Sequence, residues 1–401
     1  MQLGFKKTIV AAGVLACAVS GGGAWAQDAL RTFPQDPEAA ASIQQNLKSI
    51  KMPPGFKIEL YAMVPGARAI AVDPTTGTAY IGTRKNAVWV LHDDGNGKVS
   101  QVTEFSAASG FKDPNGVCFA PDGTLFVAEL NRILSFSNPG SATPTQKVVV
   151  PQGQLIPVGD EAYNHGARVC RVGPDGKLYV AVGEHYNVLP PEKYEAYYKE
   201  GMGAIVRYNQ DGSGREIYAH GIRNSVGLDF NPKDKTLWFT DNQTDNLGDD
   251  RPPGELNRAT KAGEDFGYPF YGGGHDRTVE YMDKTPPAGV IFPEVNLPPH
   301  AADLGMTFYE GMSFPKKYAG GIFDAEHGSW VRKHPLGARI MFTHLKPDGH
   351  AAGIEVFASG WLTPDGQYKG RPVDVEPMKD GSLLVSDDFA SAVYRISYVG
   401  K

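Results

Sequence analysis

The chain has 401 residues, of which 41% are hydrophobic and 21% are charged, so it is long enough and apolar enough for a large folded core. Its formal net charge is −6 and no long basic run is present, which argues against a nucleic-acid partner. The 48 glycines and 30 prolines show no collagen-like period and predict many turns between short strands.

The first 26 residues have the pattern of a secretory signal peptide. Lys6 and Lys7 precede the apolar run 8–19, and the small residues Ala24 and Ala26 form a cleavage site. The apolar run is too short to span a bilayer, and no later stretch reaches the length of about 18 apolar residues that a span needs. We therefore expect a periplasmic or secreted protein with no stable membrane span.

A lead-in segment is predicted at 27–53, with a weakly helical stretch at 39–48, and a repeated unit begins near residue 54. Each copy is an apolar strand, a turn rich in Pro, Asp or Gly, and a second apolar strand. The six copies have their strands at 69–72 and 78–82, 116–119 and 125–128, 168–172 and 178–181, 226–230 and 237–240, 306–308 and 322–324, and 373–375 and 383–386. This repetition predicts an all-β fold over 54–401, a six-bladed β-propeller of four-stranded antiparallel blades. A β-sandwich with chance turns is the alternative.

Two long insertions, at about 184–203 and 242–304, interrupt the repeat, and long ordered loops on a regular scaffold usually carry function. The mature chain retains Cys118 and Cys170, both in apolar strand-like runs. They are compatible either with two buried small apolar side chains or with a disulfide in an oxidising compartment. No Cys-x-x-Cys-His motif is present, which argues against covalent haem.

Two polar groups precede strands in successive repeats. His165 lies just before the strand at 168–172, where a propeller loop opens on the central channel and an imidazole can act as a general base. Arg223 and Asn224 lie at the same place in the next repeat, where a guanidinium and an amide can bind a carboxylate or a polarised carbonyl. A structural histidine and an arginine that joins two blades are the alternatives.

Acidic residues are dense in the second insertion. The five carboxylates within 241–255 are Asp241, Asp245, Asp249, Asp250 and Glu255. Oxygen ligands at this density suit Ca²⁺, which takes six to eight of them, although an acidic solvated loop would have the same composition. Later in the chain, His327, Arg332 and Arg371 supply cations from the fifth and sixth repeats. Cations that converge on one channel would suit a polyanionic cofactor, whereas each alone could be a surface residue.

The motifs of nicotinamide, flavin, serine-hydrolase and zinc-protease sites are absent from the sequence. Taken in order, the polar groups resemble the glucose/sorbosone dehydrogenase family of quinone-dependent propellers, closest to its sorbosone-dehydrogenase-like branch. The resemblance covers roughly 50–398, and its most specific motifs are 220–224, 240–242, 247–250, 255–257 and 263–269.

The resemblance implies pyrroloquinoline quinone (PQQ) near the channel mouth and calcium in the loop corresponding to 248–255. His165 matches the family's catalytic base, and Arg223, with Asn224, matches quinone contacts and would stabilise charge on the quinone oxygen. The other implied cofactor-binding residues are Asn115, His327, Arg332 and Arg371. The implied metal ligands are Gly248, Asp249, Asp250 and Glu255. Val373 replaces an arginine of the family, and Val331 replaces an asparagine of the sorbosone-like branch.

These features predict a PQQ- and calcium-dependent dehydrogenase that oxidises a sugar, a sugar aldehyde or a polyol by hydride transfer to the quinone. Its partners would be the small-molecule substrate and an external electron acceptor, a quinone or a cytochrome. A calcium-dependent lactonase or esterase propeller is one alternative, and it needs no arginine cluster. A non-catalytic carbohydrate-binding propeller is another, and neither calcium nor quinone would give it activity.

Overall fold

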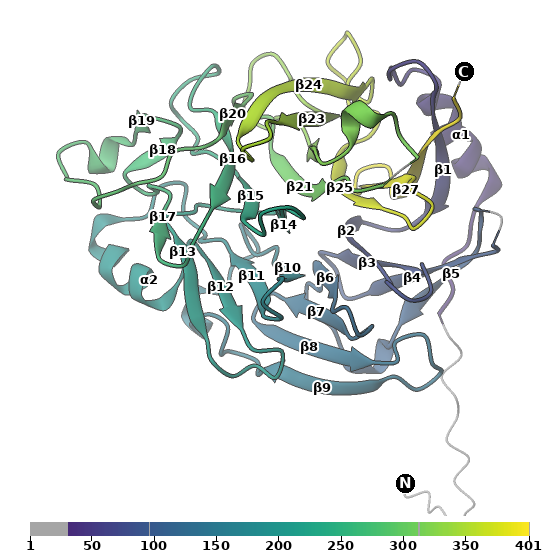
Figure 1. The fold of residues 1–401 in the computed structure, drawn as a ribbon, viewed down its shortest axis with the longest axis horizontal. Helices are drawn as coiled ribbons and strands as arrows, with labels where there is room; N and C mark the ends of the chain where they lie inside the picture. The colour runs from purple at the N-terminus through teal and green to yellow at the C-terminus, as the bar shows by residue number, and fades with distance from the viewer. Residues whose placement is uncertain (1–30, 96, 312, 401) are drawn as a thin grey trace, which may run out of the picture. The chain divides into compact units, whose positions relative to one another are not determined.

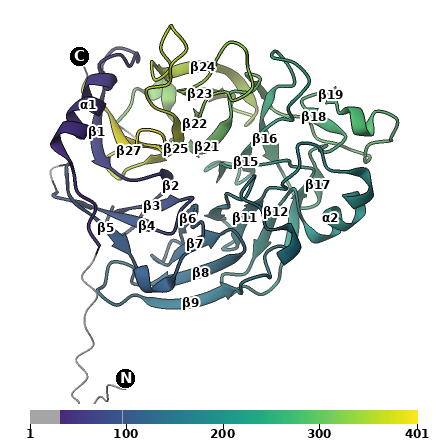
Figure 2. The same ribbon diagram turned by 180° about the vertical axis from the view of Figure 1, so that it is seen from behind.

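A computed structural model describes residues 31–95, 97–311 and 313–400. The predicted signal peptide, 1–26, lies outside this part of the chain. Six sheets surround a common axis, with the labels of their first strands gathered at the centre of Figure 1, and Figure 2 shows the same ring from behind. The six-bladed propeller is therefore confirmed, and the strand pairs expected from the repeats are the first two strands of the six blades. No helix among the described residues has the length and apolar character of a membrane span.

The first three blades follow one another along the chain. Within each blade the first strand lies nearest the axis, and the later strands follow outward in chain order. They consist of β2 (Ala67–Val72), β3 (Ala79–Thr83), β4 (Val88–Asp93) and β5 (Val99–Phe105); β6 (Gly116–Phe119), β7 (Leu125–Glu129), β8 (Arg132–Ser137) and β9 (Thr145–Val150); and β10 (Val169–Val172), β11 (Leu178–Val182), β12 (Ala204–Tyr208) and β13 (Glu216–His220). The third blade gains a fifth strand, β17 (Glu264–Asp265), which pairs in parallel with β13 and so departs from the expected four antiparallel strands.

The last three blades complete the ring. They consist of β14 (Leu228–Phe230), β15 (Leu237–Asp241), β16 (Gly254–Ala259) and β20 (Val295–Leu297); β21 (Asp303–Phe308), β22 (Ile322–Glu326), β23 (Arg339–Leu345) and β24 (Ala351–Ser359); and β25 (Pro372–Pro377), β26 (Leu383–Asp387), β27 (Ala392–Tyr398) and β1 (Phe56–Met63). The N-terminal strand β1 pairs antiparallel with the C-terminal strand β27. The two ends of the propeller therefore share one blade, which closes the ring.

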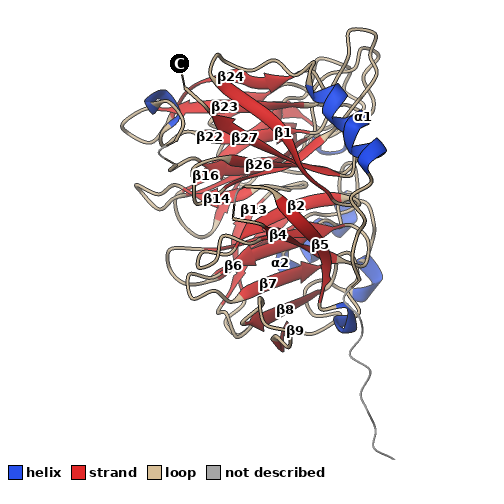
Figure 3. Cartoon of the chain, turned by 90° about the vertical axis from the view of Figure 1, so that its right-hand side faces the viewer, coloured by secondary structure: helices blue, strands red, loops and turns tan. Residues whose placement is uncertain are grey.

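Helices and short hairpins lie outside the blade strands (Figure 3). Helix α1 (Pro37–Leu47) falls within the lead-in segment, and the Asp36 carboxylate caps it by accepting the backbone N–H groups of Glu38 and Ala39. The insertion at 184–203 contains α2 (Tyr194–Glu200). The segment 242–304 is only partly an insertion, because it supplies β16 and β20 of the fourth blade as well as the hairpin of β18 (Tyr271–Gly273) and β19 (Asp276–Arg277). Single 3₁₀ turns lie at Ala107–Ser109, Val158–Asp160, Pro191–Lys193, Val279–Tyr281 and Lys316–Tyr318.

The Pro-Asp-Gly turns join the first two strands of a blade for a local reason. In the second blade the Asp122 carboxylate accepts the Thr124 N–H at 2.9 Å, and Gly123 has a φ of +86°. In the third blade Asp175 makes the same bond to a residue two positions later, and Gly176 has a φ of +73°. A left-handed residue reverses the chain there, and glycine adopts that conformation without a steric penalty.

The apolar core is divided among the interfaces between neighbouring blades. One cluster joins Tyr80 and Val88 of the first blade to Val127 and Leu134 of the second, all at most 1% exposed. The second strands of these blades, β3 and β7, are buried on both faces, so their sequences are nearly continuous apolar runs rather than alternating ones. This packing holds the loops at the axial end of each blade in fixed positions relative to the loops of its neighbours.

Cys118 on β6 and Cys170 on β10 form a disulfide between the second and third blades. The bond closes a loop with a sequence separation of 52 residues, which would restrict the unfolded chain by about 4 kcal/mol in the chain-entropy description. We predict that the double substitution Cys118→Ala/Cys170→Ala lowers the free energy of unfolding by about 2–4 kcal/mol. Urea unfolding measures the difference. Reductant should bring the wild type close to the variant, and a wild type that is insensitive to reductant would contradict the prediction.

Candidate functional site

A cavity of about 650 Å³ opens at the propeller axis, lined by segments that flank the inner strands of five blades. Its polar and charged lining residues are Arg68, Arg84, Lys85, Tyr163, Asn164, His165, Arg223, Asn224, Asn242, Gln243, Asp245, His300, His327, Arg371 and Asp388. The cavity therefore brings together His165, Arg223, Asn224, His327 and Arg371, five of the residues that the sequence places in a site.

Two positions of the repeat supply five of these charged and polar lining residues. The first is the approach to the innermost strand, which places Arg223 before β14 and Arg371 before β25. The second is the residue that directly follows the second strand, which places Arg84 after β3, His327 after β22 and Asp388 after β26. Because the two strands of each hairpin are antiparallel, the start of one and the end of the other meet at the same end of the blade.

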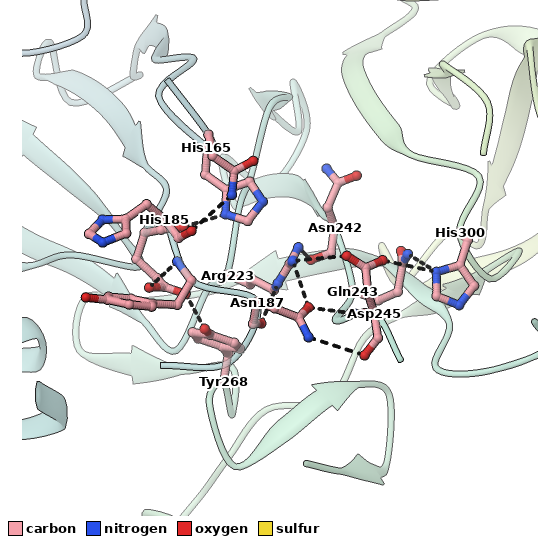
Figure 4. Close-up of polar contacts among 12 residues, drawn as sticks. His165, His185, Asn187, Arg223, Asn242, Gln243, Asp245, Tyr268 and His300 are labelled. Carbon is pink, nitrogen blue, oxygen red and sulfur yellow. Dashed lines mark hydrogen bonds and ion pairs between the residues drawn. The ribbon is translucent and has the colours of Figure 1, made fainter. Parts of the chain in front are cut away.

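His165 is held as a neutral imidazole with a defined tautomer. Its Nδ1 lies 2.5 Å from the backbone carbonyl oxygen of Glu184, and because a carbonyl only accepts, Nδ1 carries the proton (Figure 4). Burial and the charge of Arg223 lower the pKa of His165 to about 3. The Nε2 lone pair is therefore available to accept a proton from a molecule in the cavity, as a general base requires.

Glu184 supports this arrangement from beneath the cavity. Its side chain is fully buried, and it accepts hydrogen bonds from the Tyr268 hydroxyl and from the backbone N–H of Tyr186. Burial raises the pKa of Glu184 to about 7, because desolvation outweighs these two bonds and the charge of Arg223. A carboxyl group whose folded pKa is raised binds a proton that the unfolded chain releases, so its contribution to stability is lost as pH rises from about 4.5 to about 7.

We predict that Glu184→Gln removes this pH dependence. Relative to the wild type, the free energy of unfolding of the variant should improve by up to about 3 kcal/mol between pH 4.5 and pH 7.5. Urea unfolding at the two pH values measures the change. A difference between the two proteins that stays constant with pH would show that Glu184 ionises normally in the folded state.

Arg223 is fixed by a set of hydrogen bonds rather than by one ion pair. Its Nε donates to the Asn187 carbonyl at 2.9 Å, one Nη donates to the Asn187 side-chain oxygen at 3.1 Å, and the other donates to the Asn242 carbonyl at 3.2 Å (Figure 4). The Asp245 carboxylate lies 3.9 Å away. The Asp241 carboxylate accepts the backbone N–H groups of Arg223 and Asn224 at 2.8 and 2.7 Å. The guanidinium is therefore pre-oriented at the cavity wall.

On the opposite side, three blades meet in a second charged group. The Asp388 carboxylate accepts His327 Nε2 at 2.8 Å and an Arg68 Nη at 2.5 Å. Although burial opposes ionisation, the His327 hydrogen bond and the charge of Arg68 hold the pKa of Asp388 well below its usual range. Arg371 donates to the carbonyls of His327 and Gly328, at 3.0 and 2.5 Å, and has no carboxylate partner among the described residues.

The cavity is strongly positive within an acidic protein. Its lining contains five Arg and Lys side chains but only two carboxylates, Asp245 and Asp388, whereas the whole chain has a net charge of −6. The amide oxygens of Asn224 and Gln243 are buried there without a hydrogen-bond partner in the described part of the chain. Such a cavity favours an anionic ligand that also offers hydrogen-bond donors or a cation.

Two expected cofactor-binding residues lie elsewhere. Asn115 is buried behind Arg68, outside the cavity lining. Its Oδ1 accepts a hydrogen bond from Arg68 Nε at 2.8 Å, and its Nδ2 donates to the Arg168 carbonyl at 2.8 Å. Arg332 turns toward the loop after β15, where it contacts the Asp249 carbonyl and the Asp250 carboxylate. Neither residue lines the cavity, so the structure gives Asn115 a role in holding Arg68 and Arg332 a role in holding the loop.

The expected metal ligands are not brought together. The Gly248 carbonyl accepts His300 Nε2 at 2.9 Å, and Asp249 and Asp250 face Arg332 and Lys333. Glu255 instead lines a second cavity of about 10 Å³ with Asp241, between the third and fourth blades. Burial and the charge of Asp241 raise the pKa of Glu255 to about 8. No group of three or more His, Cys, Asp or Glu side chains in the described ranges is arranged to hold a metal ion.

Several lining residues were missed by the sequence analysis. Arg84 and Asp388 directly follow the second strands of their blades, as His327 does, so comparison of the six copies position by position could have identified them. Arg68 lies within the innermost strand β2. Asp245 was found only as one of several acids, and Gln243 had no distinguishing signal. The irregular loop after β15 turns these two residues, rather than Asp249 and Asp250, toward the cavity.

Comparisons with known proteins identify a family and similar folds. The family model described as Glucose / Sorbosone dehydrogenase matches residues 146–326. An uncharacterised protein from Borreliella burgdorferi is 32% identical over 361 residues, covering 87% of this chain and 91% of its own length. The holo form of the PQQ domain of pyranose dehydrogenase from Coprinopsis cinerea has a TM-score of 0.70 at 18% identity, covering 87% and 97% of the two chains. A calcium structure of a family AA12 carbohydrate-active enzyme from Trichoderma reesei has a TM-score of 0.69 at 18% identity, with the same coverage. The two solved structures share the fold.

Proposed function

The chain belongs to the glucose/sorbosone dehydrogenase family of sugar oxidoreductases, and on this premise we propose that it is a PQQ- and calcium-dependent dehydrogenase of a sugar, a sugar aldehyde or a polyol. The observation that carries the proposal is the positive axial cavity with a neutral imidazole at its wall. A cavity of about 650 Å³ has room for a flat tricyclic ring and one sugar ring.

The side chains of the cavity fit a quinone with carboxylate groups. Arg68, Arg223 and Arg371 come from three blades and lie at the cavity wall, where each is at most 8% exposed. A guanidinium binds a planar carboxylate through two parallel hydrogen bonds, and little entropy is lost because these three are already held by neighbouring groups. The unpartnered Asn224 oxygen could accept a hydrogen bond from a ring N–H.

Calcium would be held by the oxygen atoms that face the cavity. Asp245 and the unpartnered amide oxygen of Gln243 are hard oxygen donors in the lining, whereas Asp249 and Asp250 are engaged with Arg332 and Lys333 outside it. We therefore reassign the candidate ligands from the 248–255 loop to Gln243 and Asp245. The remaining positions of a six- to eight-coordinate ion would be filled by carbonyls, water and the bound quinone.

When bound, the quinone supplies the hydride acceptor and calcium supplies a Lewis acid. The protein supplies the proton acceptor and the orientation. His165 Nε2 takes the hydroxyl proton of the substrate, while Nδ1 stays bonded to the Glu184 carbonyl and keeps the ring in place. Arg223 presents fixed positive charge to the oxygen on which negative charge develops.

The disulfide between Cys118 and Cys170 supports export to an oxidising compartment, the periplasm or the exterior. Electrons would then leave the site by way of an external acceptor, a quinone or a cytochrome, because the chain has no nucleotide-binding motif for a soluble carrier.

Reconstitution of the purified protein tests the proposed function. The protein stripped with a chelator should reduce an artificial electron acceptor only when PQQ, calcium and a substrate are all added, over a panel of aldoses, osones and polyols. Hydrolysis of lactones or esters without PQQ would instead indicate a calcium-dependent hydrolase. Sugar binding without either activity would indicate a carbohydrate-binding propeller.

A further inference from the structure

The open end of the cavity carries a cation pair that the proposed chemistry does not use. Arg84 and Lys85 follow β3 in the turn to β4, and both line the cavity. The cations Arg68, Arg223 and Arg371 are buried, whereas Lys85 is exposed. The pair therefore lies nearer to solvent than the three guanidinium groups that fit the quinone.

The turn that carries this pair is held rigidly. The Thr83 hydroxyl donates to the Ala87 carbonyl at 2.7 Å and accepts the Lys85 N–H at 3.3 Å. The Lys85 carbonyl accepts the Asp113 N–H at 2.8 Å, and the Thr83 N–H donates to the Pro114 carbonyl at 3.1 Å. The backbone of the pair is thus fixed to the following blade, and its two adjacent charges are pre-positioned.

The positive charge of the pair is only partly neutralised. Arg84 Nε lies 3.6 Å from the Asp113 carboxylate, and that nitrogen is buried with no hydrogen-bond partner in the described ranges. Lys85 forms no ion pair with any carboxylate that the structure describes. An anion at the cavity mouth would therefore meet two cations, one of which, Lys85, has no salt bridge to displace in the described part of the chain.

Exposed aromatic side chains surround the same opening. Tyr163, Trp330 and Phe389 are 68%, 79% and 58% exposed, and they come from three different blade loops. They are the exposed aromatic residues of the described chain, and all three line the cavity. Aromatic rings offer flat apolar surfaces to the C–H face of a sugar ring, so their concentration here indicates where a sugar ring enters.

The pair is close to the proposed base. The Arg84 guanidinium stacks on the Tyr163 ring at 3.6 Å, and Tyr163 is two residues before His165. Arg84 also contributes to the lowered pKa of His165, which places its charge within electrostatic range of the imidazole. A carboxylate held by the pair would therefore lie in the same cavity as the imidazole that accepts the proton.

We propose that the substrate is an acidic sugar whose carboxylate is bound by Arg84 and Lys85 while its hydroxyl carbon lies against His165. The proposal rests on the proposed function for its reaction. For a uronic acid in its ring form, the C1–H and O–H bonds break and a C1=O bond forms, giving a lactone. The hydride passes to the quinone, and the proton passes to His165 Nε2, so two electrons leave the sugar and reduce the quinone.

Matched pairs of sugars test this assignment on the protein reconstituted with PQQ and calcium. D-glucuronate is compared with D-glucose and D-galacturonate with D-galactose, because each pair differs only at C6. We expect kcat/KM to favour the uronates by about 10-fold or more. Lys85→Gln should lower that preference about 10-fold, Arg84→Gln should lower it at least as much, and 0.5 M salt (a roughly 4–5 Å Debye length) should weaken it further. Lys147→Gln, on the exposed outer strand β9, is the matched control and should leave the preference unchanged.

The other possible results also decide whether the pair binds the carboxylate of an acidic sugar. Equal or greater efficiency with the neutral sugars would overturn it. Weaker PQQ binding by Lys85→Gln and Arg84→Gln, with the uronate preference intact, would overturn it as well, because the pair would then hold a cofactor carboxylate. If no sugar is oxidised, calorimetry with D-glucuronate separates the two proposals. Binding that Lys85→Gln weakens would support the acidic-sugar site although the dehydrogenase proposal had failed, and absence of binding would reject the site.

Discussion

Replacing His165 with alanine is expected to lower kcat by about 10²- to 10⁴-fold at saturating quinone and calcium, because the hydroxyl proton then loses the imidazole that is positioned to accept it. The imidazole is neutral, so its Nε2 lone pair is free to accept a proton. Its pKa lies near 3, so nearly every molecule has Nε2 ready to accept a proton at neutral pH. Its Nδ1–H bond to the Glu184 carbonyl fixes the ring, so no tautomer change is needed before reaction.

The comparison must separate chemistry from folding and binding. Quinone affinity, measured by fluorescence titration, should change little in His165→Ala, because the buried guanidinium groups remain. His344→Ala, on β23 of the fifth blade, is the matched control and should leave kcat near that of the wild type. Full turnover by His165→Ala with normal quinone affinity would show that another group, or water, accepts the proton.

The blade hairpins could be predicted from the sequence because the information that forms them is local. An apolar strand, a Pro-Asp-Gly turn and a second strand specify a hairpin by themselves, as the turns at Gly123 and Gly176 show. The six copies then imply a ring, since each exposed sheet face needs a neighbour. The pairing of β1 with β27 depends on the two ends of the chain meeting, and nothing in the sequence of β1 alone indicates it.

The cavity wall was predictable to the extent that the repeat positions its residues. His165, Arg223 and Arg371 all lie shortly before their inner strands, so finding one of them indicates the part of the repeat in which to look for the others. Arg332 does not line the cavity, because it lies in an irregular loop, where the direction of a side chain depends on long-range contacts. Its guanidinium turns away from the axis to the Asp249 carbonyl and the Asp250 carboxylate.

The metal ligands within 241–255 were equally difficult to predict from the sequence. Composition indicates many oxygen atoms near 241–255, but a binding site needs oxygen atoms that converge on one point. The Asp250 carboxylate accepts a hydrogen bond from Arg332, and the Asp249 carboxylate accepts the backbone N–H of Lys333. The Asp241 carboxylate accepts the backbone N–H groups of Arg223 and Asn224. The acids of this loop are therefore divided among structural roles, and only Asp245 faces the axial cavity.

Replacing Arg223 with glutamine is expected to lower kcat by about 10²- to 10³-fold and to weaken quinone binding, because the preorganised positive charge at the cavity wall is lost. The buried groups that contact the guanidinium also lose favourable interactions. Two carbonyls and one amide oxygen lose their donors, and Asp241 and Asp245 lose a nearby cation. The free energy of unfolding should therefore fall by about 3–5 kcal/mol.

Two further variants test this expectation: Arg223→Lys separates the charge of the side chain from its hydrogen bonds, and Arg207→Gln is the control. A lysine keeps the charge but cannot donate to the Asn187 and Asn242 oxygens together, so Arg223→Lys should recover part of the stability and little of kcat. Arg207 forms ion pairs with two carboxylates, Asp175 and Glu216, on the outer part of the third blade. Arg207→Gln should therefore lower the free energy of unfolding by about 1 kcal/mol or less and leave kcat unchanged. If Arg223→Gln lowers stability as expected yet turns over at the rate of the wild type, Arg223 joins the blade loops and has no part in the reaction. If Arg223→Lys restores full turnover, positive charge alone is sufficient and the fixed fork of hydrogen bonds is not what orients the quinone.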